Sequence, residues 1–209
     1  MTYAVKEMYF TLQGEGARTG RAAVFLRFAG CNLWSGLERD RATAVCRFCD
    51  TEFVGTGGPG GGKFATADEL AQAVAQKWPA GGRPYVVCTG GEPLLQLDEA
   101  ATAALHARGF EIGIETNGTL LPPLGVDWIC VSPKAGADCV LRRGDELKLI
   151  YPQAGAEPEL FEGLAFKHFF LQPMDSTARD ANTKATIAYC LSHPKWRLSL
   201  QTHKLIGIR

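Results

Sequence analysis

The sequence predicts an α/β fold, namely an incomplete TIM-like barrel of about six β/α units. Apolar segments rich in branched and aromatic residues alternate along the chain with segments of helical pattern. Polar clusters follow several of the apolar segments, and parallel α/β folds build their active sites at the carboxyl ends of strands. About six repeats are fewer than the eight of a closed barrel. We expect residues 1–209 to form a single domain.

The composition limits the classes of function. Of the 209 residues, 46% are apolar and 21% are charged, with a formal net charge of zero, which excludes a disordered chain. Lysine and arginine form no cluster of the kind that binds nucleic acid. No apolar run reaches the ~18–20 residues of a membrane span, and the first residues lack the pattern of a secretory signal. We therefore expect a cytoplasmic protein with neither a membrane nor a nucleic-acid partner.

The first two expected strands flank a loop that contains three glycines. Residues 5–10 predict a short strand, and the continuous apolar run at residues 22–31 predicts a strand covered on both faces. Arg27 interrupts that run, so it either reaches solvent from the strand end or faces a pocket and binds an anion. In the loop, glycine allows Gln13 and Glu15 to approach a ligand closely, although a hairpin turn would share this pattern.

The middle of the chain predicts a linker and two helices. Residues 55–62 (GTGGPGGG) are expected to form a flexible glycine-rich linker. Thr66, with Glu69 three residues later, forms a capping box, so a helix is expected from Thr66 until Pro79 stops it. Residues 97–109 predict the next helix, which ends at its terminal glycine.

The remaining apolar segments predict the other strands of the sheet. They are residues 85–89, 110–118, 126–136, 145–152, 166–173 and 196–208, with a helix at 178–193 before the last. Four polar groups follow these strands directly, namely Thr89–Glu92, Glu115–Asn117, Ser132–Lys134 and Gln172–Asp175. One such group could be an ordinary loop, but four in one chain indicate a shared site.

Three of the seven cysteines indicate an iron–sulfur centre. Cys31, Cys46 and Cys49 stand in a C-x14-C-x2-C arrangement. Three thiolates from one loop can hold three irons of a 4Fe–4S cluster and leave the fourth iron open to a small molecule. We expect residues 31–62 to form this loop, which includes an insertion and the glycine-rich linker. The alternative is a structural zinc site with a fourth ligand, although no second paired spacing of Cys or His supports it.

The other four cysteines are given no catalytic role. Cys88 and Cys130 lie in apolar segments and are expected to be small buried hydrophobic residues. Cys139 and Cys190 receive no assignment. An odd number of cysteines in a reducing compartment favours cluster ligation over disulfides.

The cysteine loop, with Phe48 before its last cysteine, and a downstream strand that ends in GGEP (residues 90–93) resemble the radical S-adenosylmethionine (SAM) enzymes. Typical members have three residues in the first gap, whereas this chain has fourteen. The segments LQGEG, FLRFAGCNLW, CDT, CTGGEPLLQ, IETNG, SPK and LQPMD resemble the 7-carboxy-7-deazaguanine synthases, in which an insertion at this place is familiar. A glycyl-radical activase, or another small radical SAM enzyme, shares the cluster and GGEP and is the alternative.

The resemblance implies a reaction. A reduced 4Fe–4S cluster would cleave SAM to methionine and a 5′-deoxyadenosyl radical, which takes a hydrogen atom from 6-carboxy-5,6,7,8-tetrahydropterin. Ring contraction and loss of ammonia would then give 7-carboxy-7-deazaguanine, a precursor of queuosine and other 7-deazapurines. The resemblance also implies Mg²⁺, a reduced flavodoxin or ferredoxin as electron donor, and a homodimer.

The resemblance implies the following site residues. Thr51 would bind Mg²⁺. The SAM contacts would be Phe48, Asp50, Gly90, Gly91, Glu92, Ser132, Pro133, Lys134, Gln172, Pro173, Met174 and Asp175. The substrate contacts would be Leu12, Gln13, Gly14, Glu15, Arg27, Thr89, Gly90, Glu115, Asn117, His203 and Arg209. Arg27 suits the substrate carboxylate, and Glu15 or Glu115 suits the donor edge of a pterin. His203 is expected on the last strand, and the other histidines are taken as structural.

Overall fold

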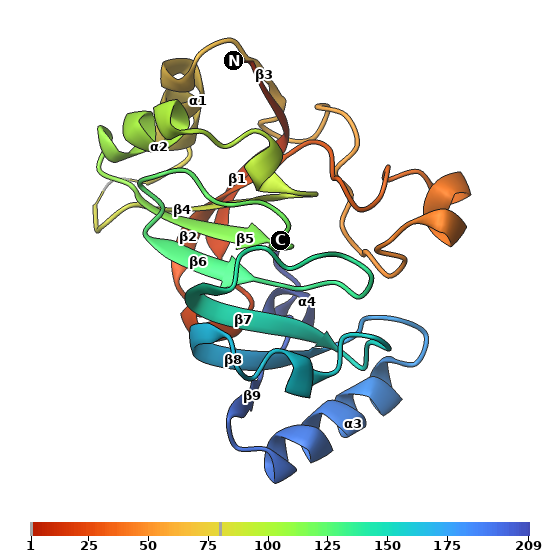
Figure 1. Cartoon of the computed structure of the whole chain (residues 1–209). Coiled ribbons are helices and arrows are strands. Elements are labelled where there is room, and N and C mark those ends of the chain that lie inside the picture. Colours follow the sequence, from red (N-terminus) through yellow and green to blue (C-terminus); the bar gives the residue numbers. More distant parts are fainter. Residues whose placement is uncertain (1, 80) are drawn as a thin grey trace.

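The computed structural model describes residues 2–79 and 81–209, in which a nine-stranded sheet is surrounded by short helices (Figure 1). The strand order is β3-β1-β2-β4-β5-β6-β7-β8-β9. The strands are β1 (Tyr3–Leu12), β2 (Ala22–Phe28), β3 (Gly62–Phe64), β4 (Tyr85–Gly90), β5 (Glu111–Thr116), β6 (Trp128–Val131), β7 (Arg143–Tyr151), β8 (Ala165–Pro173) and β9 (Trp196–Leu198). β1 pairs antiparallel with β2 and β3, whereas every pair from β2 to β9 is parallel. Because β3 and β9 end the order, the sheet is the incomplete barrel that the sequence predicts.

Three expected helices cover the sheet. They are α1 (Ala67–Ala75), α2 (Glu99–His106) and α3 (Arg179–Ser192). Thr66 Oγ1 accepts a hydrogen bond from the Glu69 N–H at 3.2 Å, and Glu69 Oε2 accepts one from the Ala65 N–H at 2.8 Å. This capping box starts α1 where the sequence predicts it. In residues 2–79 and 81–209, no helix has the length and apolar character that a membrane span requires.

Two apolar clusters hold the strands in place. Leu70 of α1 and Leu105 of α2 pack with Ile112 of β5 in the first cluster, and all three are fully buried. Leu147 and Trp196 belong to the second cluster, which includes residues from β7, β8 and β9. Each such side chain contributes about 1.5–3 kcal/mol by burial, so the strand ends sit on a firmly packed base.

The glycine-rich segment, residues 55–62, is not the flexible linker that its composition predicts. Its backbone is hydrogen-bonded to β1, because the Gly58 N–H donates to Lys6 O at 2.9 Å and the Met8 N–H donates to Pro59 O at 2.8 Å. A Cβ on Gly58 would lie 2.6 Å from Lys6 O. The glycines therefore allow close packing of two backbones rather than motion.

The prediction of one strand over residues 196–208 is wrong beyond Leu198. The chain leaves the sheet there and forms α4 (Thr202–Ile206). The backbone N–H and the hydroxyl of Thr202 both donate to Gly14 O, at 2.9 and 2.7 Å. This contact with a distant loop decides the helical turn, since the apolar pattern of the segment is compatible with a strand.

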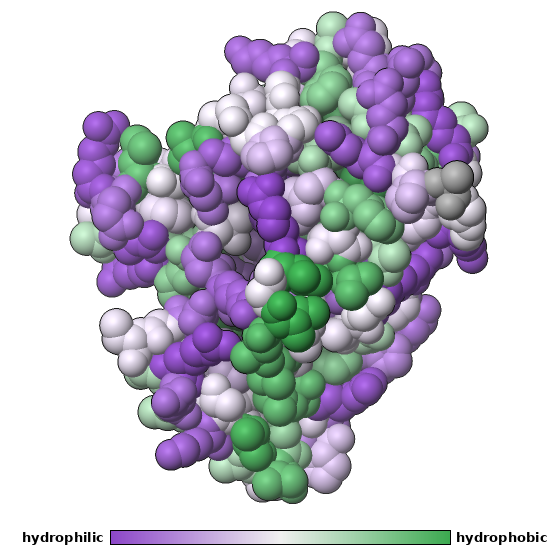
Figure 2. All heavy atoms as spheres, turned by 180° about the vertical axis from the view of Figure 1, so that it is seen from behind, coloured by the Kyte–Doolittle hydropathy of each residue, from purple (hydrophilic) through white to green (hydrophobic). Residues whose placement is uncertain are grey.

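The outer side of α4 is apolar. Leu205 and Ile206 are 59% and 62% exposed. α4 lies behind the sheet in Figure 1, and Figure 2, which views the molecule from behind, shows apolar side chains in a band down that face. The helix therefore has a polar side toward the protein and an apolar side toward solvent.

Candidate active site

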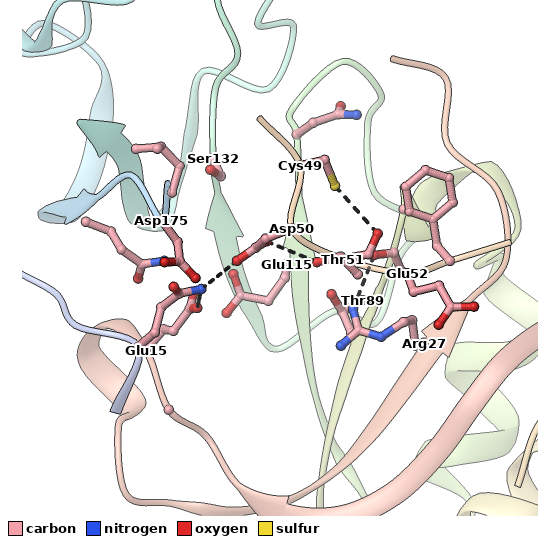
Figure 3. A pocket seen from close by; sticks show the side chains of 18 of the residues that line it. Glu15, Arg27, Cys49, Asp50, Thr51, Glu52, Thr89, Glu115, Ser132 and Asp175 are labelled. Carbon is pink, nitrogen blue, oxygen red and sulfur yellow. Dashed lines mark hydrogen bonds between the residues drawn. The ribbon is translucent and has the colours of Figure 1, made fainter. Parts of the chain in front are cut away.

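A cavity of about 460 Å³ opens at the carboxyl ends of the parallel strands (Figure 3). Four polar strand ends, the cysteine loop, the loop after β1 and the C-terminal segment all line it. The expected site residues that line it are Leu12, Gln13, Gly14, Glu15, Arg27, Cys31, Cys46, Phe48, Cys49, Asp50, Thr51, Thr89, Gly90, Gly91, Glu115, Asn117, Ser132, Lys134, Gln172, Pro173, Met174, Asp175, His203 and Arg209. Figure 3 shows Cys49 and Ser132 on one side of the cavity, with Glu15, Thr89 and Arg27 across from them.

The three thiols of the cysteine loop line this cavity. The interaction between Cys46 and Cys49 lowers the pKa of Cys49 to about 6 and raises the pKa of Cys46. Burial raises the pKa of Cys31. Lys134 is half-buried, donates to the Ser132 hydroxyl at 2.7 Å, and favours the thiolate forms of Cys46 and Cys49 by its positive charge. A thiol pair with one acidic member beside an ammonium is suited to binding a metal centre.

The arrangement fits a cluster better than a single ion. Among residues 2–79 and 81–209, no three His, Cys, Asp or Glu side chains converge closely enough to hold one metal ion. A structural zinc site needs four ligands at bonding distance from one point. A 4Fe–4S cluster spreads its thiolate ligands over separate irons, so three cysteines around one wall of the cavity suit it.

Glu92, which is expected among the SAM contacts together with the GGE backbone, has its side chain behind the cavity wall. It is fully buried, and its carboxylate accepts hydrogen bonds from the Leu94 N–H at 3.0 Å, the Thr116 hydroxyl at 2.8 Å and the Asn117 N–H at 2.8 Å. Glu92 therefore ties the end of β4 to the end of β5. Pro133 also lies outside the lining.

Arg27 is both paired and directed into the cavity, so the solvent-reaching alternative is wrong. Its Nε donates to Glu7 Oε1 at 2.9 Å, and its side chain is 15% exposed. Arg209 donates to the other oxygen of Glu7 at 3.1 Å. Two guanidinium groups thus share one carboxylate at this end of the cavity. Guanidinium groups suit an anionic group on a ligand.

Two carboxylates lie at the other end of the cavity. Glu15 and Glu115 both pair with Lys148 Nζ, at 2.7 and 2.9 Å. Burial alone would raise the pKa of Glu15, but the Lys148 ammonium outweighs it and holds that pKa below its usual value. Glu15 is therefore an ionised hydrogen-bond acceptor at neutral pH.

The C-terminal segment closes one side of the cavity through α4. Lys204 pairs with Asp50 of the cysteine loop and with Asp175 after β8, at 2.6 Å each. His203 lies against the loop after β1, where a Cβ on Gly14 would come within 2.2 Å of its ring. Burial lowers the pKa of His203. His203 thus lines the cavity, as expected, but from a helix rather than from a strand.

Comparison with known proteins decides the family. A model described as the Radical SAM superfamily matches residues 41–145. A 7-carboxy-7-deazaguanine synthase from Caulobacter vibrioides is 66% identical over 209 residues and covers the whole of both chains, and one from Bordetella pertussis is 67% identical over 211 residues with the same coverage. This chain belongs to the 7-carboxy-7-deazaguanine synthases. The crystal structure of QueE from Escherichia coli is similar, with a TM-score of 0.71 and 31% identity over 97% of this chain and 95% of that one.

Membership of the 7-carboxy-7-deazaguanine synthases confirms the resemblance inferred from the motifs and the barrel-like fold. It separates the chain from the glycyl-radical activases and from zinc-binding modules. Radical SAM enzymes use a 4Fe–4S cluster and SAM, and the donor set of Cys31, Cys46 and Cys49 fits such a cluster.

Several polar residues that line the cavity were not predicted from the sequence. Among them are Lys6 and Glu7 of β1, Glu52 after the cysteines, Lys148 of β7, Gln201 before α4, and Lys204. Lys148 carried a signal, because Glu146 and Lys148 stand two residues apart on one strand and so share one face. Gln201 and Lys204 were taken as part of a strand, and the pattern gave no sign that they would cross the cavity.

Proposed function

We propose that this chain converts 6-carboxy-5,6,7,8-tetrahydropterin to 7-carboxy-7-deazaguanine with loss of ammonia, in the biosynthesis of queuosine and other 7-deazapurines. The observation that carries the proposal is the cavity itself, where three thiols face two carboxylates and an arginine pair. The full-length similarity to proteins named for this product supports the same conclusion.

Cys31, Cys46 and Cys49 would hold the cluster. When reduced and bound to SAM, the cluster supplies a 5′-deoxyadenosyl radical. Lys134 is suited to the methionyl carboxylate of SAM, because it is a point charge that lines the cavity near the thiols. Gly90 and Gly91 bring bare backbone to the cavity wall. The other proposed SAM contacts are Phe48, Asp50, Ser132, Gln172, Pro173, Met174 and Asp175.

The pterin would lie between the charged groups at the two ends of the cavity. Arg27 and Arg209 would bind its carboxylate, since both guanidinium groups line this end of the cavity. Glu15 and Glu115 would accept hydrogen bonds from its amino-pyrimidine edge, which carries two donors. The other proposed contacts come from Leu12, Gln13, Gly14, Thr89, Asn117 and His203.

We propose Thr51 as a Mg²⁺ ligand. Its hydroxyl lines the cavity directly after the cysteine loop, between the proposed SAM and pterin positions. A hydroxyl is a hard oxygen donor, and Mg²⁺ usually completes its shell with water and substrate oxygens. Omitting Mg²⁺ is expected to slow turnover, measured as product per minute in metal-free buffer with and without added MgCl₂. A metal-independent rate would count against Thr51 in this role.

Three further assignments accompany the proposal. A reduced flavodoxin or ferredoxin would supply the electron, since the cysteine loop projects at one side of the sheet (Figure 1). A homodimer is supported by the apolar band on the face of α4 (Figure 2). A cytoplasmic setting is supported by seven cysteines that are all free thiols.

The direct test is an anaerobic assay of the reconstituted, reduced protein with SAM, Mg²⁺ and the carboxy-tetrahydropterin, followed by mass spectrometry. We expect 7-carboxy-7-deazaguanine from the wild-type protein. Cys49→Ala is the matched control, and it should contain less iron and sulfide and form no product. A protein that is loaded with cluster and cleaves SAM, yet gives no deazaguanine, would refute the proposed function.

A further inference from the structure

Lys148 is a buried cation between two carboxylates that come from other parts of the chain. Its side chain is 5% exposed, and its Nζ lies 2.7 Å from Glu15 Oε2 and 2.9 Å from Glu115 Oε2. The second oxygen of each carboxylate accepts from an amide. Gln201 Nε2 donates to Glu15 Oε1 and Gln13 Nε2 donates to Glu115 Oε1, both at 3.1 Å. Each carboxylate thus gives one oxygen to Lys148 and one to a neutral donor.

Several other titratable groups face this centre. Glu146, two residues before Lys148 on β7, accepts from the Ala17 N–H at 2.9 Å and from the Cys130 thiol at 3.5 Å. The positive charge of Lys148 acts on Lys134 and His203, where it contributes to lowering the pKa of each. Glu146 is therefore hydrogen-bonded to the loop after β1 and is not assigned to the ligand.

Both carboxylates lie close to one ammonium, at 2.7 and 2.9 Å, and without it two negative charges would face each other with no cation between them. Like charges at short range raise the pKa of one member of the pair, which then becomes a donor instead of an acceptor. Lysine is suited to prevent this, because a compact ammonium has three N–H groups that can point to separate carboxylates. Its attachment to β7 inside the core also fixes the distance between them.

We propose that Lys148 is a positioning residue for substrate recognition, which holds Glu15 and Glu115 as a matched pair of acceptors for the two N–H donors of an amino-pyrimidinone edge. The inference rests on the proposed function, and it adds a residue and a reason for selectivity. The side-chain amides of Gln13 and Gln201 donate to Glu115 and Glu15, and the N–H donors of the ligand would take the places of these amides. A ligand edge that presents an acceptor at either place would set it against a carboxylate oxygen with no donor between them, so it would be rejected.

The test compares Lys148→Met and Lys148→Arg with a surface control, Lys167→Met. Lys167 is 71% exposed and pairs with Asp145, outside the cavity. Binding of the carboxy-tetrahydropterin and of SAM is measured separately by anaerobic calorimetry over a range of pH. In Lys148→Met we expect the Kd of the pterin to rise roughly 10- to 100-fold, as fits the loss of charge-supported hydrogen bonds, with SAM affinity nearly unchanged. Lys148→Arg should restore part of the affinity, and Lys167→Met should match wild type.

The pH dependence separates this role from a general packing role. The pterin needs an ionised Glu15, whose pKa the Lys148 ammonium lowers, so its affinity falls as pH drops through that pKa. Removing the ammonium raises the pKa of Glu15, and the fall in affinity should therefore begin at a higher pH in Lys148→Met. An unchanged pterin Kd and pH profile, or equal losses of pterin and SAM affinity, would overturn the proposal.

A second variant covers the case in which Lys148→Met does not fold. The double variant Lys148→Met with Glu146→Gln also removes a buried carboxylate that is not assigned to the substrate. The net negative charge left behind by the loss of the ammonium is therefore smaller. Thermal unfolding reports whether it folds, and wild-type pterin affinity in that variant would overturn the proposal. Because binding is measured without turnover, a wild-type protein that binds the pterin but forms no product refutes the proposed function alone. A wild-type protein that does not bind the pterin overturns both.

Discussion

Replacing Glu92 by glutamine tests how the ends of β4 and β5 are held. Glu92 Oε1 accepts from the Leu94 N–H and the Thr116 hydroxyl, while Oε2 accepts from the Asn117 N–H at 2.8 Å. In Glu92→Gln one oxygen becomes an NH₂ group, so the Asn117 N–H would face a donor. A charge-assisted hydrogen bond contributes about 1.5–3 kcal/mol, and a buried donor left unpaired costs about 1–3 kcal/mol.

The net effect is smaller than the sum of these values. Burial raises the pKa of Glu92, which means that the charged form is itself costly to bury, and the neutral amide avoids that cost. We therefore expect the free energy of unfolding to fall by about 2 kcal/mol, measured by urea denaturation of the apoprotein at neutral pH. The pterin affinity should fall as well, because Asn117 and Glu115 lie at the same strand end.

The matched control for this prediction is Glu99→Gln. Glu99 is an exposed acid in the first turn of α2, so its replacement should change the free energy of unfolding by less than about 1 kcal/mol. If Glu92→Gln is no less stable than Glu99→Gln, the carboxylate does not hold the strand ends as the structure indicates.

Three other variants test separate parts of the account. Arg27→Gln should weaken pterin binding more than SAM binding in calorimetry, since it removes a guanidinium group from one end of the cavity, and equal losses would argue against that role. Gly14→Ala places a Cβ 2.2 Å from the His203 ring, so α4 must shift. Pterin affinity should fall while the melting temperature changes little, and unchanged affinity would contradict this packing. The Arg21 hydrogen bond lowers the pKa of Glu111 from 4.5 to about 2, so at about 1.4 kcal/mol per pH unit Glu111→Gln should cost about 3 kcal/mol at neutral pH. That difference from wild type should disappear as pH falls from about 4.5 to about 2, and a loss independent of pH would exclude the ion pair as its cause.

The sequence predicted the parallel strands and the polar groups after them because both are local features. A continuous apolar run such as YVVC on β4 is typical of a strand covered on both faces, whatever its neighbours are. Once the strands are parallel, their carboxyl ends must share an edge, so the cavity lining at Glu115, Ser132 and Asp175 follows.

The features that the sequence did not predict depend on pairings between distant segments. Lys148 meets Glu115 only because β5, β6 and β7 align Glu115 with Cys130 and Cys130 with Glu146. The turn into α4 depends on the hydrogen bonds from Thr202 to Gly14, as described above. The position of Glu92 behind the wall depends on three donors that come into place only when the ends of β4 and β5 lie side by side.

The most direct test of the central claim is a crystal structure of the cluster-loaded protein with SAM and the carboxy-tetrahydropterin bound. We expect a cluster on Cys31, Cys46 and Cys49, with the pterin carboxylate on Arg27. We also expect the amino-pyrimidine edge within hydrogen-bond distance of Glu15 and Glu115, both still paired with Lys148. A pterin bound outside this cavity, or turned so that its carboxylate faces Glu15 and Glu115, would contradict the proposed binding mode.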